Sequence, residues 1–157
     1  MTNLLHFAYG SNMSLKQMKD RCPGSRPIGI AVLRDHELAF TRIGIDRKCG
    51  VADVVPLKGS HVWGRLFELS PLDLRELDKH EGAARKIGPN SYDRVTMEVD
   101  IDGDPSERIS VQVYVVPSSA RGSHLPNRAY MDLIISGAME ASLPLDYRQM
   151  LARITVC

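Results

Sequence analysis

The sequence is poor in cysteine, and its cysteines are not spaced to act together. Its 157 residues include only three, Cys22, Cys49 and Cys157, and none belongs to a Cys-x-x-Cys motif. An odd, scattered set fits neither a disulfide framework nor a cysteine-rich zinc site. The five histidines also lack the His-x-x-x-His spacing of a helical zinc site. We therefore expect a reducing, cytoplasmic location, no disulfide and no metal.

Long apolar runs, nucleotide motifs and a strong charge of one sign are also missing. No stretch approaches the roughly 20 apolar residues of a membrane span, and the first residues lack the basic opening of an export signal. Neither a Gly-x-Gly-x-x-Gly motif nor a phosphate loop is present. Lys and Arg number 20 against 19 for Asp and Glu, a net charge of +1, which would not attract nucleic acid strongly. We expect no cofactor, no membrane and no nucleic acid partner.

What the sequence does contain is the composition of one ordinary folded domain, spanning residues 1–157. Hydrophobic residues make up 43% and charged residues 25%, close to the averages of globular proteins. Short apolar and β-branched segments, bounded by Gly, Pro, Asp or Ser, predict strands. Because strands outnumber helices and do not alternate with them regularly, the pattern favours an α+β fold over a doubly wound parallel sheet. The predicted strands are 4–9, 28–33, 37–41, 51–55, 61–69, 92–99 and 109–116.

Four helices are predicted, and the second has the clearest ends. Ser70 is suited to cap its first turn, Pro71 fits the first helical position, and Gly82 is the expected stop. The other helices are expected at 14–20, after Pro126, and after a restart at 143–145.

Glu81 is the first candidate for chemistry. It follows Leu74 and Leu77 at helical spacing, so its side chain should share their inward-facing stripe. It also lies in the last turn, where the helix dipole disfavours a negative charge. A desolvated carboxylate there should have a raised pKa, as a general base working near neutrality needs. The alternatives are a glutamate that extends to solvent and a structural ion pair with Arg85 or Lys86.

The second candidate is the segment 7–13, Phe-Ala-Tyr-Gly-Ser-Asn-Met. A strand that ends in Gly10, Ser11 and Asn12 before a helix directs successive backbone N–H groups into one space, where they can receive a carboxylate or an oxyanion. The alternative is a simple strand-to-helix turn capped by Asn or Ser. Ser11 does not match a nucleophile elbow, because no glycine stands two places after it.

Two aromatic residues are less informative by themselves. Trp63, beside Gly64 in an apolar strand, is expected in the core. Tyr130, on the helix after Pro126, fits either a core position or a hydroxyl group that contacts a ligand.

Several short motifs occur in this chain in the same order and with the same spacing as in one known family. They are Phe-Ala-Tyr-Gly-Ser-Asn-Met at 7–13, Val-Trp-Gly-Arg-Leu-Phe at 62–67, Leu-Asp-Lys-His-Glu-Gly at 77–82 with Tyr92, and Leu-Pro-Leu-Asp-Tyr at 143–147. Tyr130 and Ile-Ile-Ser-Gly-Ala at 134–138 extend the match, so that it covers nearly the whole chain. In these motifs the sequence resembles the γ-glutamylcyclotransferase family.

The resemblance implies a fold and an activity. The fold would be a small mixed β-barrel of about six or seven strands with helices packed around it. The activity would be that of an often homodimeric, cofactor-free enzyme that releases 5-oxoproline from a small-molecule γ-glutamyl amide.

The resemblance also implies roles for individual residues. Glu81 matches the catalytic acid/base, Tyr130 a tyrosine that contacts substrate, and Tyr92 a tyrosine near the site. The connection 82–91 is longer than usual in the family, so the outer pocket is not carried over. Relatives that act on γ-glutamyl amines have Tyr-Gly-Thr-Leu where this chain has Tyr-Gly-Ser-Asn, which favours γ-glutamyl amino acids as substrates. The family's substrate loop matches His6, Phe7, Ala8, Tyr9, Gly10, Ser11 and Asn12.

Other functions are compatible with the same residues. One is a related cyclotransferase for γ-glutamyl amines or γ-glutamyl-acylated metabolites. Another is a hydrolase that uses Ser11. A third is a ligand-binding barrel without turnover, against which the presence of Glu81 argues.

Overall fold

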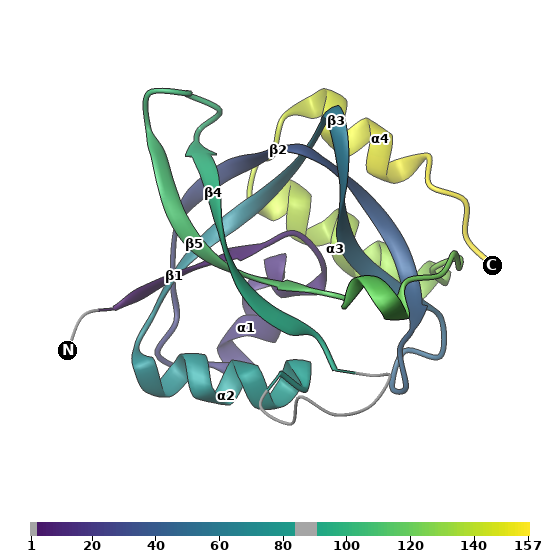
Figure 1. Cartoon of the computed structure of the whole chain (residues 1–157), viewed down its shortest axis with the longest axis horizontal. Helices are drawn as coiled ribbons and strands as arrows, with labels where there is room; N and C mark the ends of the chain where they lie inside the picture. The colour runs from purple at the N-terminus through teal and green to yellow at the C-terminus, as the bar shows by residue number, and fades with distance from the viewer. Residues whose placement is uncertain (1–2, 84–90) are drawn as a thin grey trace.

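A closed β-barrel forms the centre of the molecule. The computed structural model describes residues 3–83 and 91–157. Within them, five strands close the barrel in the order β1-β3-β2-β4-β5. Neighbouring strands are antiparallel except β1 and β5, which pair in parallel where His6 faces Gln112. The strands are β1 (Leu4–Ala8), β2 (Arg26–Ile43), β3 (Gly50–Leu69), β4 (Asp93–Ile101) and β5 (Arg108–Val115). The α+β class and the mixed barrel are therefore confirmed (Figure 1).

The predicted number of strands, six or seven, was wrong for a physical reason. Segments 28–33 and 37–41 belong to one long strand, β2, and segments 51–55 and 61–69 belong to β3. The polar residues between the two segments of each strand bend the strand but do not end it, and β2 and β3 stay paired on both sides of the bend. The register shifts between Arg34 and His36, Asp35 takes a positive φ of 60°, and its carboxylate accepts a hydrogen bond of 3.0 Å from the Gly59 N–H. Such a bulge contains Asp and Gly, the same residue types as a turn, so the sequence pattern predicted a strand end where the strand continues.

Helices cover the barrel on two sides. In Figure 1, α1 (Leu15–Arg21) and α2 (Pro71–Glu81) lie below the barrel, while α3 (Arg128–Glu140) and α4 (Leu145–Ala152) pack against each other behind it. The predicted ends of α2 are confirmed: Ser70 Oγ accepts from the Asp73 N–H, and Gly82 ends the helix with a φ of 74°. No helix in the described part of the chain has the length and apolar character of a membrane span.

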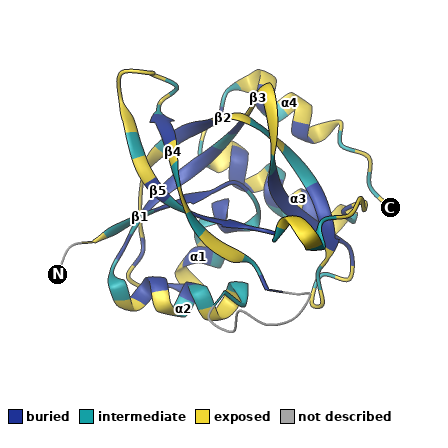
Figure 2. Ribbon diagram, in the orientation of Figure 1, coloured by how far each residue is buried: buried dark blue, intermediate teal, exposed yellow. Residues whose placement is uncertain are grey.

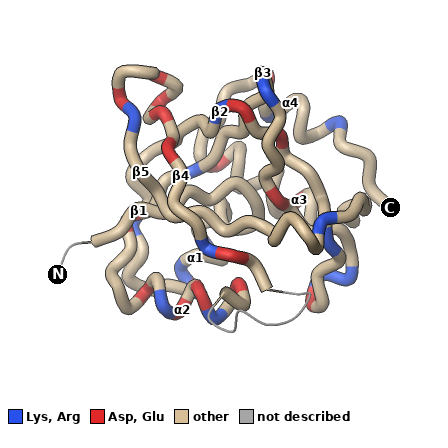
Figure 3. The backbone as a smooth tube through the Cα atoms, in the orientation of Figure 1, with Lys and Arg blue, Asp and Glu red and all other residues tan. Residues whose placement is uncertain are grey.

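The core runs along the strands and the inward helix faces, as the buried residues in Figure 2 show. Trp63, expected in the core, is instead only partly buried and packs against it. Cys22 and Cys49 are buried and Cys157 is exposed, and all three thiols are free. Acidic and basic residues are interspersed over the backbone trace in Figure 3, in keeping with the small net charge.

A short 3-10 helix, η1 (Ser11–Met13), follows β1 and is held from two sides. A Cβ atom at Gly137 would lie 2.9 Å from the Met13 Cβ, so only glycine lets α3 approach this closely. From the barrel, the buried Arg65 donates a hydrogen bond of 3.0 Å to the Met13 carbonyl. These contacts fix the turn that begins the candidate site.

Candidate active site

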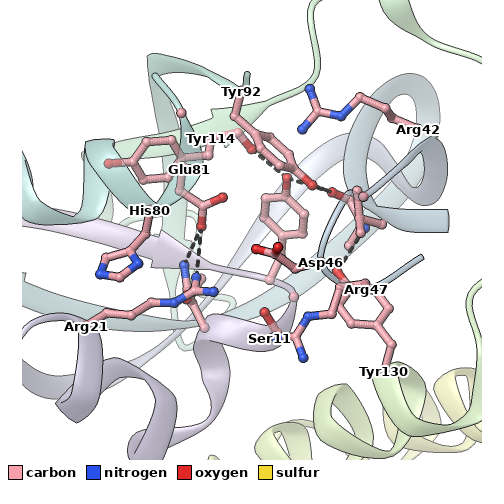
Figure 4. A pocket seen from close by; sticks show the side chains of 18 of the residues that line it. Ser11, Arg21, Arg42, Asp46, Arg47, His80, Glu81, Tyr92, Tyr114 and Tyr130 are labelled. Atoms are coloured by element: carbon pink, nitrogen blue, oxygen red, sulfur yellow. Dashed lines mark hydrogen bonds and ion pairs between the residues drawn. The ribbon is translucent and has the colours of Figure 1, made fainter. Parts of the chain in front are cut away.

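A cavity of about 620 Å³ opens where β1, the end of α2 and the loop between β2 and β3 meet. This volume lies within the roughly 300–1,000 Å³ usual for small-molecule sites. Every residue that the family resemblance assigned to the site lines this cavity: Glu81, Tyr92, Tyr130 and the segment from His6 to Asn12. Figure 4 shows how the polar side chains converge on it from several elements.

Glu81 is the last residue of α2 and turns inward, as its spacing predicted. Leu74 and Leu77, on the same stripe, are 4% and 0% exposed, and the Glu81 side chain is only 15% exposed. Burial raises the pKa of the Glu81 carboxyl, and the positive charge of Arg21 and a hydrogen bond from Asn12 oppose that rise. The result is a shielded carboxyl group whose pKa lies above its usual range.

The partners of Glu81 come from distant parts of the chain. Asn12 Nδ2 donates to Glu81 Oε1 at 2.9 Å, and Arg21 Nη1 lies 3.5 Å from the same oxygen. Arg85 and Lys86, the ion-pair partners that the sequence suggested, lie outside the described residues. The observed ion pair with Arg21 is long, and it leaves Glu81 at the cavity wall.

The amide of Asn12 has one consistent orientation. Its Oδ1 accepts from Gln17 Nε2 and from Arg21 Nη1, each at 2.9 Å. Two donors on one side require the oxygen there, so the NH₂ group must face Glu81. Gln17 Nε2 also donates to Ser11 Oγ at 2.8 Å, so this hydroxyl is engaged by an amide rather than by a histidine base.

Tyr92 and Tyr130 both bind the backbone of Ala52 in β3, but in opposite senses. Tyr92 donates its hydroxyl proton to the Ala52 carbonyl at 2.7 Å. Tyr130 instead accepts from the Ala52 N–H at 3.0 Å, so its own proton is available to a ligand. Burial raises the pKa of both phenols, that of Tyr130 to about 12, and both therefore stay protonated at neutral pH.

His6 forms a neutral part of the wall. It is 2% exposed, and its Nδ1–H donates to the Gln112 carbonyl at 3.2 Å. Burial lowers the pKa of the imidazole from 6.5 to about 4. Asp78, the other acidic residue of this helical turn, accepts from the Tyr114 hydroxyl at 2.6 Å and from Arg94 at 2.9 Å. Glu81 is thus the carboxylate of α2 that faces the cavity.

Sequence reasoning missed several residues of the cavity wall. Arg21 ends α1, where a cation is ordinary at a helix C-terminus and gives no signal. Arg42, Asp46 and Arg47 come from the end of β2 and the loop that follows, and Tyr114 comes from β5. Only closure of the barrel brings them to Glu81. In the described ranges, no group of three or more His, Cys, Asp or Glu residues could hold a metal ion.

A small barrel with a shielded carboxylate, Glu81, facing a polar cavity is the geometry of a compact enzyme, and the comparisons agree with this class. The AIG2-like family model matches residues 61–151, more than half of the chain. The chain therefore belongs to the AIG2-like family. This agrees with the resemblance found in the sequence motifs.

Individual relatives are similar over almost the full chain. Human γ-glutamylcyclotransferase is 28% identical over 156 residues, covering 97% of this chain and 79% of the relative. The cattle (Bos taurus) γ-glutamylcyclotransferase is 29% identical with the same coverage. A solved γ-glutamyl cyclotransferase structure superposes with a TM-score of 0.89 at 26% identity, covering 99% of this chain and 89% of that one.

Proposed function

We propose that the protein is a cyclotransferase that converts γ-glutamyl amides, foremost γ-glutamyl amino acids, to 5-oxoproline and a free amine or amino acid. The observation that carries this proposal is the shielded Glu81 carboxyl, with its raised pKa, at the wall of a cavity lined by the 6–12 segment. The relatives named γ-glutamylcyclotransferase support it.

The substrate supplies both reacting groups. The α-amine of a γ-glutamyl amide can reach its own γ-carbonyl carbon and close a five-membered ring, so nucleophile and electrophile are already in one molecule. The α-nitrogen gives up two protons as the ring closes. The leaving nitrogen gains two protons as the old amide bond breaks, and no water is consumed.

Glu81 is suited to move these protons. Its carboxylate takes a proton from the α-ammonium, which frees the amine to attack, and then returns it to the departing nitrogen. A raised pKa makes both transfers easier near neutrality because the carboxyl group is then a stronger base and still an adequate acid.

The rest of the wall would hold the substrate. The first N–H groups of a helical turn have no partners within it, and those of η1 lie at the cavity wall beside Glu81. We assign the backbone from Tyr9 to Asn12 to the polar groups of the glutamyl part and the developing oxyanion. Tyr130 can donate its free hydroxyl proton, whereas Tyr92, whose proton is used on Ala52, would shape the pocket or accept.

The test is a screen of γ-glutamyl dipeptides, γ-glutamyl amines and glutathione, with products identified by mass spectrometry. The proposal expects 5-oxoproline from at least one γ-glutamyl dipeptide. Release of glutamate from every substrate would instead indicate hydrolysis. Binding without any product would indicate a ligand-binding barrel.

The acid limb of the pH profile should report Glu81. Because the base must be ionised, kcat/KM should fall as the pH drops through the pKa of Glu81, and this should occur above pH 4.5, the ordinary value. Arg21→Gln removes the charge that lowers this pKa, so the acid limb should move to higher pH. The measurement is kcat/KM from pH 4 to 9.

Lys19→Gln is the matched control, because Lys19 is an exposed cation in the same last turn of α1. It should leave the acid limb in place. An acid limb that stays unchanged or moves to lower pH in Arg21→Gln would show that another group sets it.

A further inference from the structure

The cavity carries more positive than negative side chains. Among the residues that the structure describes, four cationic residues line it against two carboxylates, with the cations on α1, β2, the β2–β3 loop and α2. A partly enclosed site with an excess of one charge concentrates ligands of the opposite charge. The cationic residues are Arg21, Arg42, Arg47 and Lys79, and the carboxylates are Asp46 and Glu81.

Two of the arginines already have defined structural partners. Arg21 interacts with Asn12 and Glu81. Arg42 lies over the ring of Tyr92, 4.5 Å from its centroid, and donates to the Ser91 carbonyl at 2.8 Å. Their contacts account for the positions of these two side chains without a ligand.

Arg47 is held in place while most of its donors remain unused. Its Nη2 donates to Gln17 Oε1 at 2.7 Å, and its guanidinium lies 5.3 Å from the centroid of the Tyr130 ring. Asn127 Nδ2 fixes its backbone by donating to its carbonyl at 3.2 Å. A guanidinium has five N–H groups, and within residues 3–83 and 91–157 only one of them donates to the protein.

No carboxylate of the described residues lies within ion-pair distance, 4.0 Å, of Arg47. The neighbouring Asp46 also lines the cavity, but no ion pair within 4.0 Å joins it to Arg47 in that part of the chain. An oriented, half-buried guanidinium with free donors is the usual receptor for a carboxylate.

Arg47 stands across the cavity from Glu81. Figure 4 shows Glu81 and Arg21 on one side and Arg47 with Tyr130 on the other. If Glu81 takes the proton of the α-ammonium, the glutamyl α-carbon and its carboxylate lie near Glu81. The departing nitrogen must also lie near Glu81 to receive the proton, and its substituent, directed away from the closing ring, extends toward the opposite wall.

We propose that Arg47 binds the α-carboxylate of the departing amino acid and thereby makes the site selective for γ-glutamyl amino acids over γ-glutamyl amines. This inference rests on the proposed cyclotransferase function and adds the residue that selects the leaving group. Tyr130 orients the guanidinium plane, and Gln17 connects Arg47 to Asn12 beside the proton-transferring carboxylate.

The test compares two substrates that differ only by that carboxylate, γ-glutamylalanine and γ-glutamylethylamide. The wild-type protein should have the higher kcat/KM for γ-glutamylalanine. In Arg47→Gln the ratio of the two kcat/KM values should fall by about ten- to a hundredfold, the usual size of a charge-assisted hydrogen bond. Arg47→Lys keeps the charge without the planar donor pair and should retain part of the preference.

Lys48→Gln is the matched control, because it removes an exposed positive charge from the adjacent position and Lys48 does not line the cavity. It should preserve the ratio. A wild-type ratio near one would overturn the inference without touching the cyclotransferase proposal. An equal loss for both substrates in Arg47→Gln would also overturn it and would place the glutamyl carboxylate at Arg47. No 5-oxoproline from either substrate would overturn the proposed function itself.

Discussion

Glu81→Gln is expected to lose almost all turnover while the protein stays folded. Glutamine has nearly the same shape and can still accept the hydrogen bond from Asn12, which Glu81 Oε1 now receives at 2.9 Å. It cannot accept a proton from the α-ammonium. General acid–base groups supply about 10²- to 10⁴-fold in rate, and we expect the upper end for a residue that serves two transfers. Turnover should be measured together with binding of 5-oxoproline, which should be retained.

The same variant should be more stable than the wild type at neutral pH. The folded pKa of Glu81 is raised, so the folded state holds its proton to higher pH than the unfolded state does. Between the two pKa values the stability of the wild type therefore falls as the pH rises. Glutamine does not ionise, so the stability of the variant does not fall in this way. The difference in stability between variant and wild type should disappear below about pH 4.5, the ordinary pKa of a glutamate.

Glu76→Gln is the control for both measurements. It makes the same change on the same helix, at a side chain that is 44% exposed and pairs with Lys79. Its turnover and melting should be close to those of the wild type. A folded Glu81→Gln protein with more than about a tenth of wild-type turnover, far above the loss expected of a general base, would remove Glu81 from the mechanism.

Of the substitutions proposed for this protein, Asp53→Ala should lower the free energy of unfolding the most. Asp53 is completely buried in β3 and accepts from Thr41 Oγ1 at 2.9 Å, from Arg121 Nε at 2.8 Å, and from the N–H groups of Val54 and Val116. Alanine would leave these donors and the Arg121 charge without their acceptor. Breaking a buried ion pair in this way costs about 3–5 kcal/mol. The free energy of unfolding in urea is the measurement.

The matched control is Asp20→Ala, which breaks an exposed ion pair with Lys16 on α1. Exposed helix pairs of this kind contribute about 0.3–0.5 kcal/mol, so the change should be small. If Asp53→Ala were no more destabilising than Asp20→Ala, the buried Asp53 network would not be the anchor between β3 and the chain after β5 that the geometry indicates.

The parts of the fold that follow from local chemistry could be predicted from the sequence. The start of α2 depends on Ser70 and Pro71 and its end on Gly82, all within one helix, and both ends were predicted correctly. The full lengths of β2 and β3 could not be predicted. Asp35 in β2 and Gly59 in β3 are joined by a hydrogen bond at a bend, and the sequence pattern does not show that these two residues lie opposite each other. Residues that continue a bent strand look like residues that end one.

In the candidate site, too, residues marked by local chemistry could be predicted and residues placed by long-range contacts could not. Glu81 could be identified because it breaks two local rules, an acid on an apolar stripe and an acid at a negative helix end. Arg47 breaks none, and its place in the cavity depends on contacts with Gln17 and Tyr130 that only the closed barrel creates. Long-range placement of this kind has no signature in the spacing of residues along the chain.

One measurement tests the central claim of intramolecular cyclisation most directly. The protein is incubated with γ-glutamylalanine in water labelled with heavy oxygen, and the products are analysed by mass spectrometry. Attack by the substrate's own α-amine consumes no water, so the account predicts 5-oxoproline free of label together with one equivalent of alanine. Glutamate that carries one labelled oxygen would contradict it, because that product requires water as the nucleophile.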